Sequence, residues 1–564
     1  MTKLRIGFLL DDLSPSHQVN ELIEFVNGNE SFDNPVLITG YKKNKHEPVL
    51  KKLVMKIKQR PINLFNSLTK AFLKLVINRI ELQSAKRKYP GYITKQKIEK
   101  IDNFIVVHVE GKWSKSHLFL EMTKEDLSLI SDYKLDCIIR CGSGIIRGGL
   151  LEITKFGVIS FHHGDNRSNR GGPSGFWEVL NDEPSSGFVI QKLNQELDGG
   201  EILFRGNLMT SSIWLQNNAQ LLVKSNSFMM ELLLSIAKNR ELPPSEGVRL
   251  HGNMLYKLDS SWYLIQYLLK ILLPKIFDTI INKLMSPKKV RWSVAYSYHN
   301  DFSKSLWRYK EIKNPKGRFL ADPFVFKKNG ENFVFVEDFS FRDKKGRISA
   351  IKLDGDDYDF LGVVMEEDFH LSFPFVFRDG ENIYMIPESS ENGDIRLYKS
   401  IDFPLKWEFE KQLMVDVDAA DTMLFKNNET WFLLTNICSA KLGDHQSELH
   451  IFYSEDFKIG EWNPIESKNP VIFDSLKARN GGFFSHNGKL YRINQVHGKA
   501  HYGKSFNINE IEVLSKESYA EKAVSMVQPN FKDSSTSTHH FNANAEVAVV
   551  DFARKERLRK AIKK

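Results

Sequence analysis

In the first 140 residues, short apolar runs alternate with segments whose apolar residues have helical spacing. Residues 5–10, 35–40 and 105–109 are apolar runs typical of buried strands, and residues 16–27 repeat apolar positions every three or four residues. Residues 135–139 form another strand-like run. The pattern predicts a Rossmann-like α/β sheet. Because no GxGxxG motif follows the first run, we expect no dinucleotide at the first turn.

Three further segments have helical periodicity. Residues 48–89 repeat apolar positions between many lysines and are interpreted as part of a basic helical insertion over about 48–100. Residues 211–239 would close the first domain. Residues 262–285 are long and apolar, but Lys270, Pro274 and Lys275 interrupt them and argue against a transmembrane span. This amphipathic segment packs against a neighbouring domain in one interpretation and lies on a membrane surface in the other.

From residue 290 the pattern changes to short runs of aromatic and β-branched residues. The same unit recurs four times, as a strand, an Asn- or Asp-containing turn and a second strand: 319–337, 371–386, 419–435 and 478–494. A recurrence of about fifty to sixty residues is typical of four-stranded propeller blades. Residues 290–297, or the late run 546–552, could complete a fifth blade. The pattern therefore predicts a five-bladed β-propeller.

Composition limits the possibilities further. At 564 residues the chain is too long for one core, so we expect a multidomain protein: an α/β domain at 1–255, a helical linker at 256–289 and the propeller at 290–555. Three cysteines exclude a disulfide framework, and the first apolar run is too short for a signal peptide. These features predict a cytoplasmic protein. The net charge of +9 is modest, and no nucleic-acid partner is expected.

The stretch 156–205 contains the strongest candidate chemistry. It has Ser160-Phe161-His162 at the end of a predicted strand, Asn169-Arg170-Gly171 in a glycine-rich loop, and Phe176-Trp177 in a short helix. A second predicted strand, residues 187–197, leads into Asp198-Gly199-Gly200-Glu201-Ile202. A histidine and a carboxylate thus follow two strands, where α/β sheets bind their ligands.

These motifs resemble the formyltransferase family that uses 10-formyltetrahydrofolate. Its members formylate initiator methionyl-tRNA, glycinamide ribonucleotide or amino sugars. The resemblance implies that His162 donates to the tetrahedral oxyanion and that Asp198 sets its ionisation and relays the amine proton. Ser160 stands where the family has an asparagine, and its hydroxyl offers one donor in place of the amide.

The resemblance also implies binding residues. The folate would contact the strand end and loop formed by Arg140, Cys141, Gly142 and Gly144, together with Gly199. His163 is either a further donor or part of the loop packing. Arg167 and Arg170 would hold a phosphate or carboxylate of the substrate, or else remain solvated. Cys137 and Cys141 are interpreted as buried strand cysteines, and we assign no residue to a metal.

The second half resembles the propeller-like domain of plant glucosamine inositolphosphorylceramide transferases. The similar phrases are Ala321-Asp322-Pro323-Phe324, His370 to Pro374, Met385 to Ser389, Ala478 to Gly482, Tyr502-Gly503-Lys504 and Glu512 to Lys516. In those proteins glycosyl transfer is attributed to a separate domain, which is not found in this sequence. The resemblance therefore implies the handling of carbohydrate or glycolipid.

Three carboxylates occupy inner-strand positions of different repeats. Asp322, Glu388 and Asp421 could meet in a central channel, with Arg479 paired to one of them. Five-bladed glycoside hydrolases use such a triad, and hydrolysis needs two carboxylates about 5–10 Å apart. We favour a sugar-binding funnel and keep hydrolysis as the alternative.

The sequence thus predicts formyl transfer to the amine of an amino sugar, nucleotide-linked or lipid-linked, in the synthesis of surface polysaccharide or glycolipid. The first rival is a carbohydrate-binding or glycan-hydrolysing propeller with a degenerate formyltransferase domain. The second is a non-catalytic assembly factor for surface polysaccharide.

Overall fold

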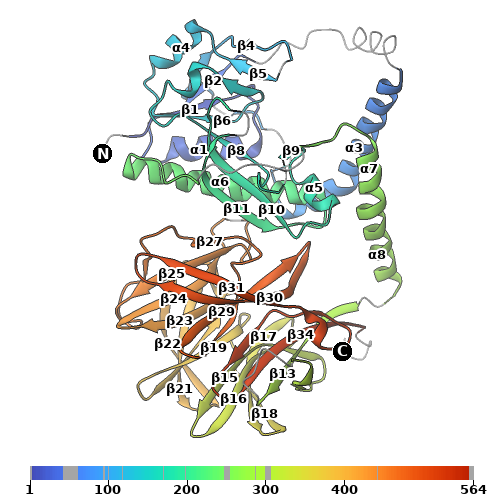
Figure 1. Cartoon of the computed structure of the whole chain (residues 1–564), viewed down its shortest axis with the longest axis vertical. Helices are drawn as coiled ribbons and strands as arrows, with labels where there is room; N and C mark the ends of the chain where they lie inside the picture. The colour runs from blue at the N-terminus through green and yellow to red at the C-terminus, as the bar shows by residue number, and fades with distance from the viewer. Residues whose placement is uncertain are drawn as a thin grey trace. The chain divides into compact units, whose positions relative to one another are not determined.

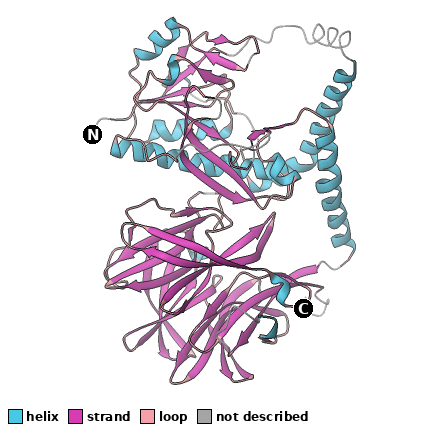
Figure 2. Cartoon of the chain, in the orientation of Figure 1, coloured by secondary structure: helices cyan, strands magenta, loops and turns pink. Residues whose placement is uncertain are grey.

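The computed structural model divides the chain into two compact units, Met1–Pro274 and Lys275–Lys564. It describes residues 3–41, 61–92, 96–98, 101–116, 118–168, 170–196, 199–246, 255–285, 288–298, 306–440 and 442–557. The first unit combines helices and strands, whereas strands dominate the second (Figures 1 and 2).

A seven-stranded sheet forms the centre of the first unit. Its order is β11-β10-β8-β6-β1-β2-β3; the strands from β8 to β3 are parallel, and β10 and β11 are antiparallel. The bounds are β1 Ile6–Leu9, β2 Val36–Thr39, β3 Ile105–His108, β6 Cys137–Arg140, β8 Val158–His162, β10 Ser185–Lys192 and β11 Glu201–Met209. All residues of β1 and β2 are buried, as expected for central parallel strands. The predicted α/β sheet is confirmed.

Helices flank this sheet, and α6 packs on β10 (Figure 1). The helices are α1 His17–Gly28, α3 Pro61–Lys88, α4 Lys124–Ser131, α5 Phe176–Leu180, α6 Trp214–Asn239, α7 Trp262–Tyr267 and α8 Leu273–Leu284, with a π-helical turn at Leu268–Leu272. Two small sheets complete the unit, one of β4 Lys112–Trp113, β5 Phe119–Glu121 and β7 Ile145–Arg147, the other of β9 Arg170–Gly172 and β12 Leu255–Lys257. In the described part of the chain, no helix is long and apolar enough to cross a bilayer.

The second unit begins with three antiparallel sheets. The first contains β15 Arg318–Lys328, β16 Glu331–Ser340, β17 Lys345–Asp354 and β18 Asp357–Met365. The second contains β19 Ser372–Asp379, β20 Asn382–Glu388, β21 Asp394–Asp402 and β22 Lys406–Val415. The third contains β23 Ala419–Asn427, β24 Thr430–Ile437, β25 Glu448–Ser454, β26 Asn463–Pro464 and β27 Ile472–Phe473. The predicted pairs of strands are confirmed here.

The remaining strands differ from the expected separate four-stranded blades. They form one nine-stranded sheet, made of β13 Lys288–Ser297, β14 Lys310–Glu311, β28 Asn480–His486, β29 Lys489–Gly498, β30 His501–Leu514, β31 Tyr519–Val527, β32 Ser535–Ser537, β33 Phe541–Ala543 and β34 Ala548–Arg557. A single parallel pair, Phe484 with Ala543, joins its two parts. The two runs considered as alternative fifth blades pair with each other over ten positions, as β13 and β34. Strands from both ends of this unit therefore share one sheet.

A bulge recurs in the first strand of four of these repeats. The register shifts after Ala321, Ser372, Ala420 and Asn480. Asp322 and Asp421 lie directly after two of these points and have φ of +49° and +50°. A positive φ is costly for residues other than glycine, and such strain is concentrated at functional sites. The bulges therefore make one end of the first strand in each of these repeats a candidate location for a functional site.

Candidate functional site

The carboxyl ends of β6 and β8 bring Arg140 beside Ser160. The two residues are register partners, and Arg140 Nη1 donates to Ser160 Oγ over 3.3 Å. Arg140 Nε also donates to the Gly144 carbonyl over 3.1 Å, which fixes the guanidinium against the loop after β6. Burial lowers the pKa of Arg140, but a guanidinium remains charged near neutral pH. A half-buried guanidinium thus lies beside the serine hydroxyl.

His162 and His163 follow at the end of β8. His162 is half-buried and pairs in register with Val189 of β10. The Nε2 atom of His163 lies 3.0 Å from Ser225 Oγ on α6, and its ring stacks on Phe161. Burial, with a smaller contribution from His162, lowers the pKa of His163 to about 3. His163 is therefore neutral and contributes to packing, which is one of the two roles expected for it.

The loop after β6 is held by an acidic residue from the end of β1. Asp11 Oδ1 accepts hydrogen bonds from Ser143 N and Ser143 Oγ, each at 2.7 Å, and from the Tyr41 hydroxyl at 3.3 Å. A Cβ at Gly142 would lie 1.8 Å from the Tyr41 oxygen, so only glycine fits there. Burial raises the pKa of the Cys141 thiol to about 12 and also raises that of Cys137 to about 12. The loop is a rigid backbone edge beside Arg140, and both thiols are protonated.

The other predicted residues of this unit are placed differently. Arg167 pairs with Asp165 through Nε and Nη2, and Asp165 also accepts from Arg205 at 2.6 Å, so the exposed Arg167 is held in an ion network with Asp165 and Arg205. Gly199 accepts a hydrogen bond at its carbonyl from Asn194. The strand expected at residues 187–197 is β10, which ends at Lys192 because the pairing with β8 and β11 ends there.

Two predicted positions cannot be placed in the site. Asp198 lies outside the described residues. The backbone of Arg170 belongs to β9 and pairs with Leu255, and its side chain is likewise outside the described part. The catalytic role of Asp198 stays a prediction.

In the second unit, an ion network joins two of the three predicted carboxylates. Arg479 Nε lies 2.5 Å from Asp421 Oδ2, and Arg479 Nη2 lies 3.5 Å from Glu388 Oε2. Gln495 Nε2 donates to the same oxygen of Asp421 over 3.1 Å. The side chains of Asp421 and Glu388 are only 3% and 14% exposed. The predicted pairing of Arg479 with a carboxylate is therefore present.

The pKa values of these two carboxyl groups are shifted in opposite directions. Burial raises the pKa of Asp421 well above its ordinary value, and Arg479 only partly offsets this effect. Burial acts in the same direction on Glu388, but Arg479 and a hydrogen bond with Asp421 lower its pKa. Two buried carboxyl groups thus lie side by side around one guanidinium.

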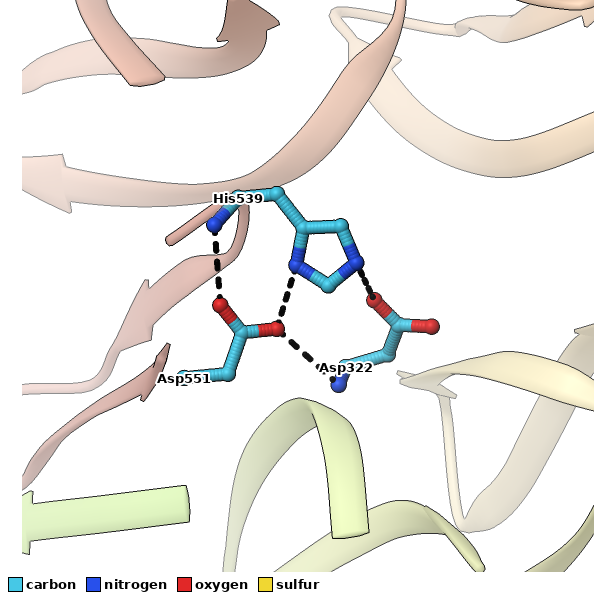
Figure 3. Close-up of side chains that lie close together, drawn as sticks. All are labelled: Asp322, His539 and Asp551. Atoms are coloured by element: carbon cyan, nitrogen blue, oxygen red, sulfur yellow. Dashed lines mark hydrogen bonds and ion pairs between the residues drawn. The ribbon is translucent and has the colours of Figure 1, made fainter. Parts of the chain in front are cut away.

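The third predicted carboxylate, Asp322, belongs to a separate part of this centre. Its nearest ionisable partners are His539 and Asp551, which Figure 3 shows, and His540; none of these three is a candidate in the sequence. Burial raises the pKa of Asp322 to about 6. Glu337 was also missed; it lies 3.5 Å from His370 Nε2, and its pKa is raised by burial and by neighbouring carboxylates. In the sequence, the adjacent histidines His539 and His540 before β33 are the signal that could have indicated this cluster.

Comparisons with known proteins agree with part of this description. Residues 309–550 match the family model described as glucosamine inositolphosphorylceramide transferase 1, N-terminal. The glucosamine inositolphosphorylceramide transferase 1 of Arabidopsis thaliana is 38% identical over 211 residues, which cover 36% of this chain and 27% of that protein. The chain thus spans about a quarter of the length of this relative.

Among solved structures, a sugar N-formyltransferase from Shewanella sp. FDAARGOS_354 aligns with 47% of this chain and 88% of its own, at 12% identity and a TM-score of 0.26. The catalytic domain of the Coprinopsis cinerea GH62 α-L-arabinofuranosidase aligns with 47% of this chain and 97% of its own, at 11% identity and a TM-score of 0.32. At these TM-scores neither likeness carries an argument. What the comparisons show is that the carboxy-terminal half is similar to the amino-terminal domain of glucosamine inositolphosphorylceramide transferases.

Proposed function

We propose that the first unit transfers a formyl group from 10-formyltetrahydrofolate to the amine of an amino sugar, nucleotide-linked or lipid-linked. The observation that carries this proposal is the hydrogen bond of Arg140 with Ser160 near the carboxyl ends of β6 and β8, with His162 two residues further along β8. Acyl transfer to an amine needs donors at the developing oxyanion, and a fixed guanidinium is a strong one. Arg140 would thus supply what the missing asparagine amide supplies in the family.

The loop residues fit a folate in their chemistry. The loop after β6 lies beside Arg140, which donates to the Gly144 carbonyl, and it is anchored through Asp11, which accepts from Ser143 N. Peptide groups can pair with the polar edge of a pterin. In this proposal His162 donates to the oxyanion, and Asp198 accepts the proton that leaves the amine.

We also propose that the second unit is a five-bladed propeller that binds the glycan or glycolipid acceptor. The recurring bulges and the similarity of residues 309–550 to a domain of glycolipid-directed transferases support this role. The activity would belong to the synthesis of surface polysaccharide or glycolipid. We place it in the cytoplasm, with contact to the inner face of the membrane.

The test is calorimetric binding of 5-formyltetrahydrofolate, a stable folate analogue, to the full-length protein. Micromolar binding is expected, together with formylation of at least one amino sugar in a panel of nucleotide-linked and lipid-linked acceptors. His162→Ala and Asp198→Ala should bind the analogue but lose transfer. A folded protein that binds no folate would overturn the proposal.

A second candidate, glycan hydrolysis by the second unit, is favoured by one observation. Asp421 and Glu388 are buried carboxyl groups that both contact Arg479, so two carboxyl groups lie close together. Hydrolysis of aryl glycosides that disappears in Asp421→Asn, while folate binding persists, would support this function. Absence of hydrolysis across a broad glycoside panel would leave glycan binding as the role of this unit.

A further inference from the structure

One face of helix α3 is fixed to the rest of the first unit (Figure 1). Ile77, Glu81 and Ala85 follow one another at intervals of four residues, and all three are buried. The carboxyl group of Glu81 accepts hydrogen bonds from the Tyr267 hydroxyl of α7 at 2.5 Å and from Leu215 N, in the first turn of α6, at 2.8 Å. The helix therefore has an inner face that is already occupied by packing and hydrogen bonds.

The opposite face of α3 carries a strip of exposed apolar side chains. Leu68, Phe72 and Leu75 are 57%, 65% and 67% exposed, and their spacing of four and three residues places them on one side of the helix. Phe72 lies nine residues before the buried Glu81, and at about 100° per residue the two point to opposite sides. Single exposed apolar residues are ordinary, but a contiguous strip marks a surface that contacts a protein or a membrane.

The charges on α3 are almost all positive. Residues 61–88 contain six lysines and arginines and one acidic residue, the buried Glu81. Beyond Leu75 the outer face continues with Arg79 and Lys86, which are exposed. Among the residues that the structure describes, none forms an ion pair or a hydrogen bond with the side chains of Arg79, Lys86 or the neighbouring Lys74. The exposed side of α3 thus combines apolar side chains with uncompensated positive charge.

This charge decides between two kinds of partner. In a symmetric dimer, the second copy would bring the same unpaired cations to the interface, and like charges oppose association. Anionic phospholipids offer acyl chains to the apolar strip and negative head groups to the lysines and arginines. We propose that the outer face of α3, defined by Leu68, Phe72, Leu75 and Arg79, binds the surface of an anionic phospholipid membrane.

The inference specifies the membrane contact of the proposed function but does not rest on formyl transfer. Binding to a vesicle needs neither folate nor an amino sugar, so failure of one proposal leaves the other testable. Most of α8 belongs to the other compact unit, and substitutions confined to α3 separate the two helices.

The test is flotation of the full-length protein with vesicles of phosphatidylcholine alone and of equal parts phosphatidylcholine and phosphatidylglycerol. Binding is expected on the anionic vesicles. Leu75→Asp should weaken it roughly tenfold or more, because the apolar contact is lost and a negative charge is added. Lys74→Gln combined with Arg79→Gln should weaken it about fivefold for each charge removed. The matched control is Leu118→Asp, the same substitution at a leucine of this unit that lies outside α3 and is 57% exposed.

Several results would overturn the proposal. The wild type then binds neither kind of vesicle, or binds both equally, or Leu75→Asp binds as well as Leu118→Asp. Light scattering that shows a wild-type dimer, dissociated by Leu75→Asp and without affinity for vesicles, would assign this face to a second copy instead. If circular dichroism shows that Leu75→Asp does not fold, the Lys74→Gln, Arg79→Gln variant decides, and unchanged affinity of that variant would contradict the assignment.

Discussion

Arg140 and Ser160 are register partners on two adjacent parallel strands, and the guanidinium of Arg140 donates to the serine hydroxyl over 3.3 Å. The strand pairing itself therefore places a guanidinium beside the hydroxyl of Ser160. The second anchor of Arg140, the Gly144 carbonyl, prevents the guanidinium from turning away. Because both contacts fix the guanidinium beside Ser160, Arg140 is the first residue to substitute.

Arg140→Met should lower kcat for formyl transfer by about 100–1,000-fold, the cost of removing one oxyanion donor. Binding of 5-formyltetrahydrofolate should change much less, because the loop backbone remains. The measurement is steady-state kinetics beside calorimetry. Arg147→Met is the matched control, since Arg147 packs its guanidinium on the ring of Phe119. Equal kinetic losses in both variants would show a general effect of charge.

Arg479→Met should destabilise the second unit strongly. The substitution leaves Asp421 and Glu388 buried without their guanidinium, and breaking a buried ion pair typically costs about 3–5 kcal/mol. Urea denaturation of the wild type and the variant measures the change in the free energy of unfolding of the second unit.

The control for this prediction is Arg342→Met. Arg342 pairs with Asp343, but its side chain is 75% exposed, so its loss should cost less than about 1 kcal/mol. Restoration of stability in the double variant Arg479→Met, Asp421→Leu would agree with the explanation by an unpaired charge. A similar small loss in both single variants would contradict it.

The sequence predicts the strands and helices around the first sheet well, because residues close together in the chain determine each of them. Strands such as β1 and β2 are apolar throughout, and α4 begins with a capping box between Thr123 and Asp126. The pairing of β13 with β34 was not predicted, because it joins residues more than 250 positions apart. Long-range pairing leaves no periodic trace in either strand.

The same limit explains the missed residues of the second unit. His539 and Asp551 come together because β33 pairs with β34, and Asp322 joins them through a bulge with positive φ. The repeat position of Asp322 indicates an inner-strand site, but a bulge changes the direction in which a side chain points, and no sequence pattern shows the bulge. The sequence predicts Arg140 only as a cofactor-binding residue, because its approach to Ser160 depends on the register of β6 and β8.

Acid should weaken the first unit through His163. The pKa of this residue is lowered to about 3 in the folded protein, against about 6.5 in the unfolded chain. Below pH 6.5 the unfolded chain takes up a proton that the folded protein does not, so stability falls as pH falls from 6.5 towards 3. At pH 5 the loss is about 2 kcal/mol relative to neutral pH.

Thermal unfolding of wild type and His163→Gln between pH 5 and 8 measures this effect. The variant should be less stable than the wild type at pH 8, because contacts with Ser225 change, and the difference should shrink at pH 5. Parallel curves for the two proteins across this range would show that His163 does not contribute to the pH dependence.

Helix α8 should bind anionic membranes through its apolar face. Leu273, Phe277, Ile280 and Leu284 are about half or more exposed, and they follow one another at helical spacing. None of the residues of this helix is buried, and Lys275 and Lys283 belong to the same helix. A helix that has one apolar face and also carries lysines binds a membrane surface in two ways. Its apolar side chains are buried among the lipids, and its lysines are attracted to anionic headgroups.

Phe277→Asp should reduce binding to vesicles that contain phosphatidylserine by more than about tenfold, because burying a phenylalanine contributes about 1.5–3 kcal/mol. Asn282→Asp is the matched control, since it adds the same charge on the polar side of α8. Cosedimentation with anionic vesicles, and with phosphatidylcholine vesicles for comparison, measures both variants. If Asn282→Asp reduces binding as much as Phe277→Asp, the attraction is electrostatic alone and the apolar face is not inserted. If neither variant changes binding, a different surface contacts the membrane, and the packing interpretation of residues 262–285 is favoured.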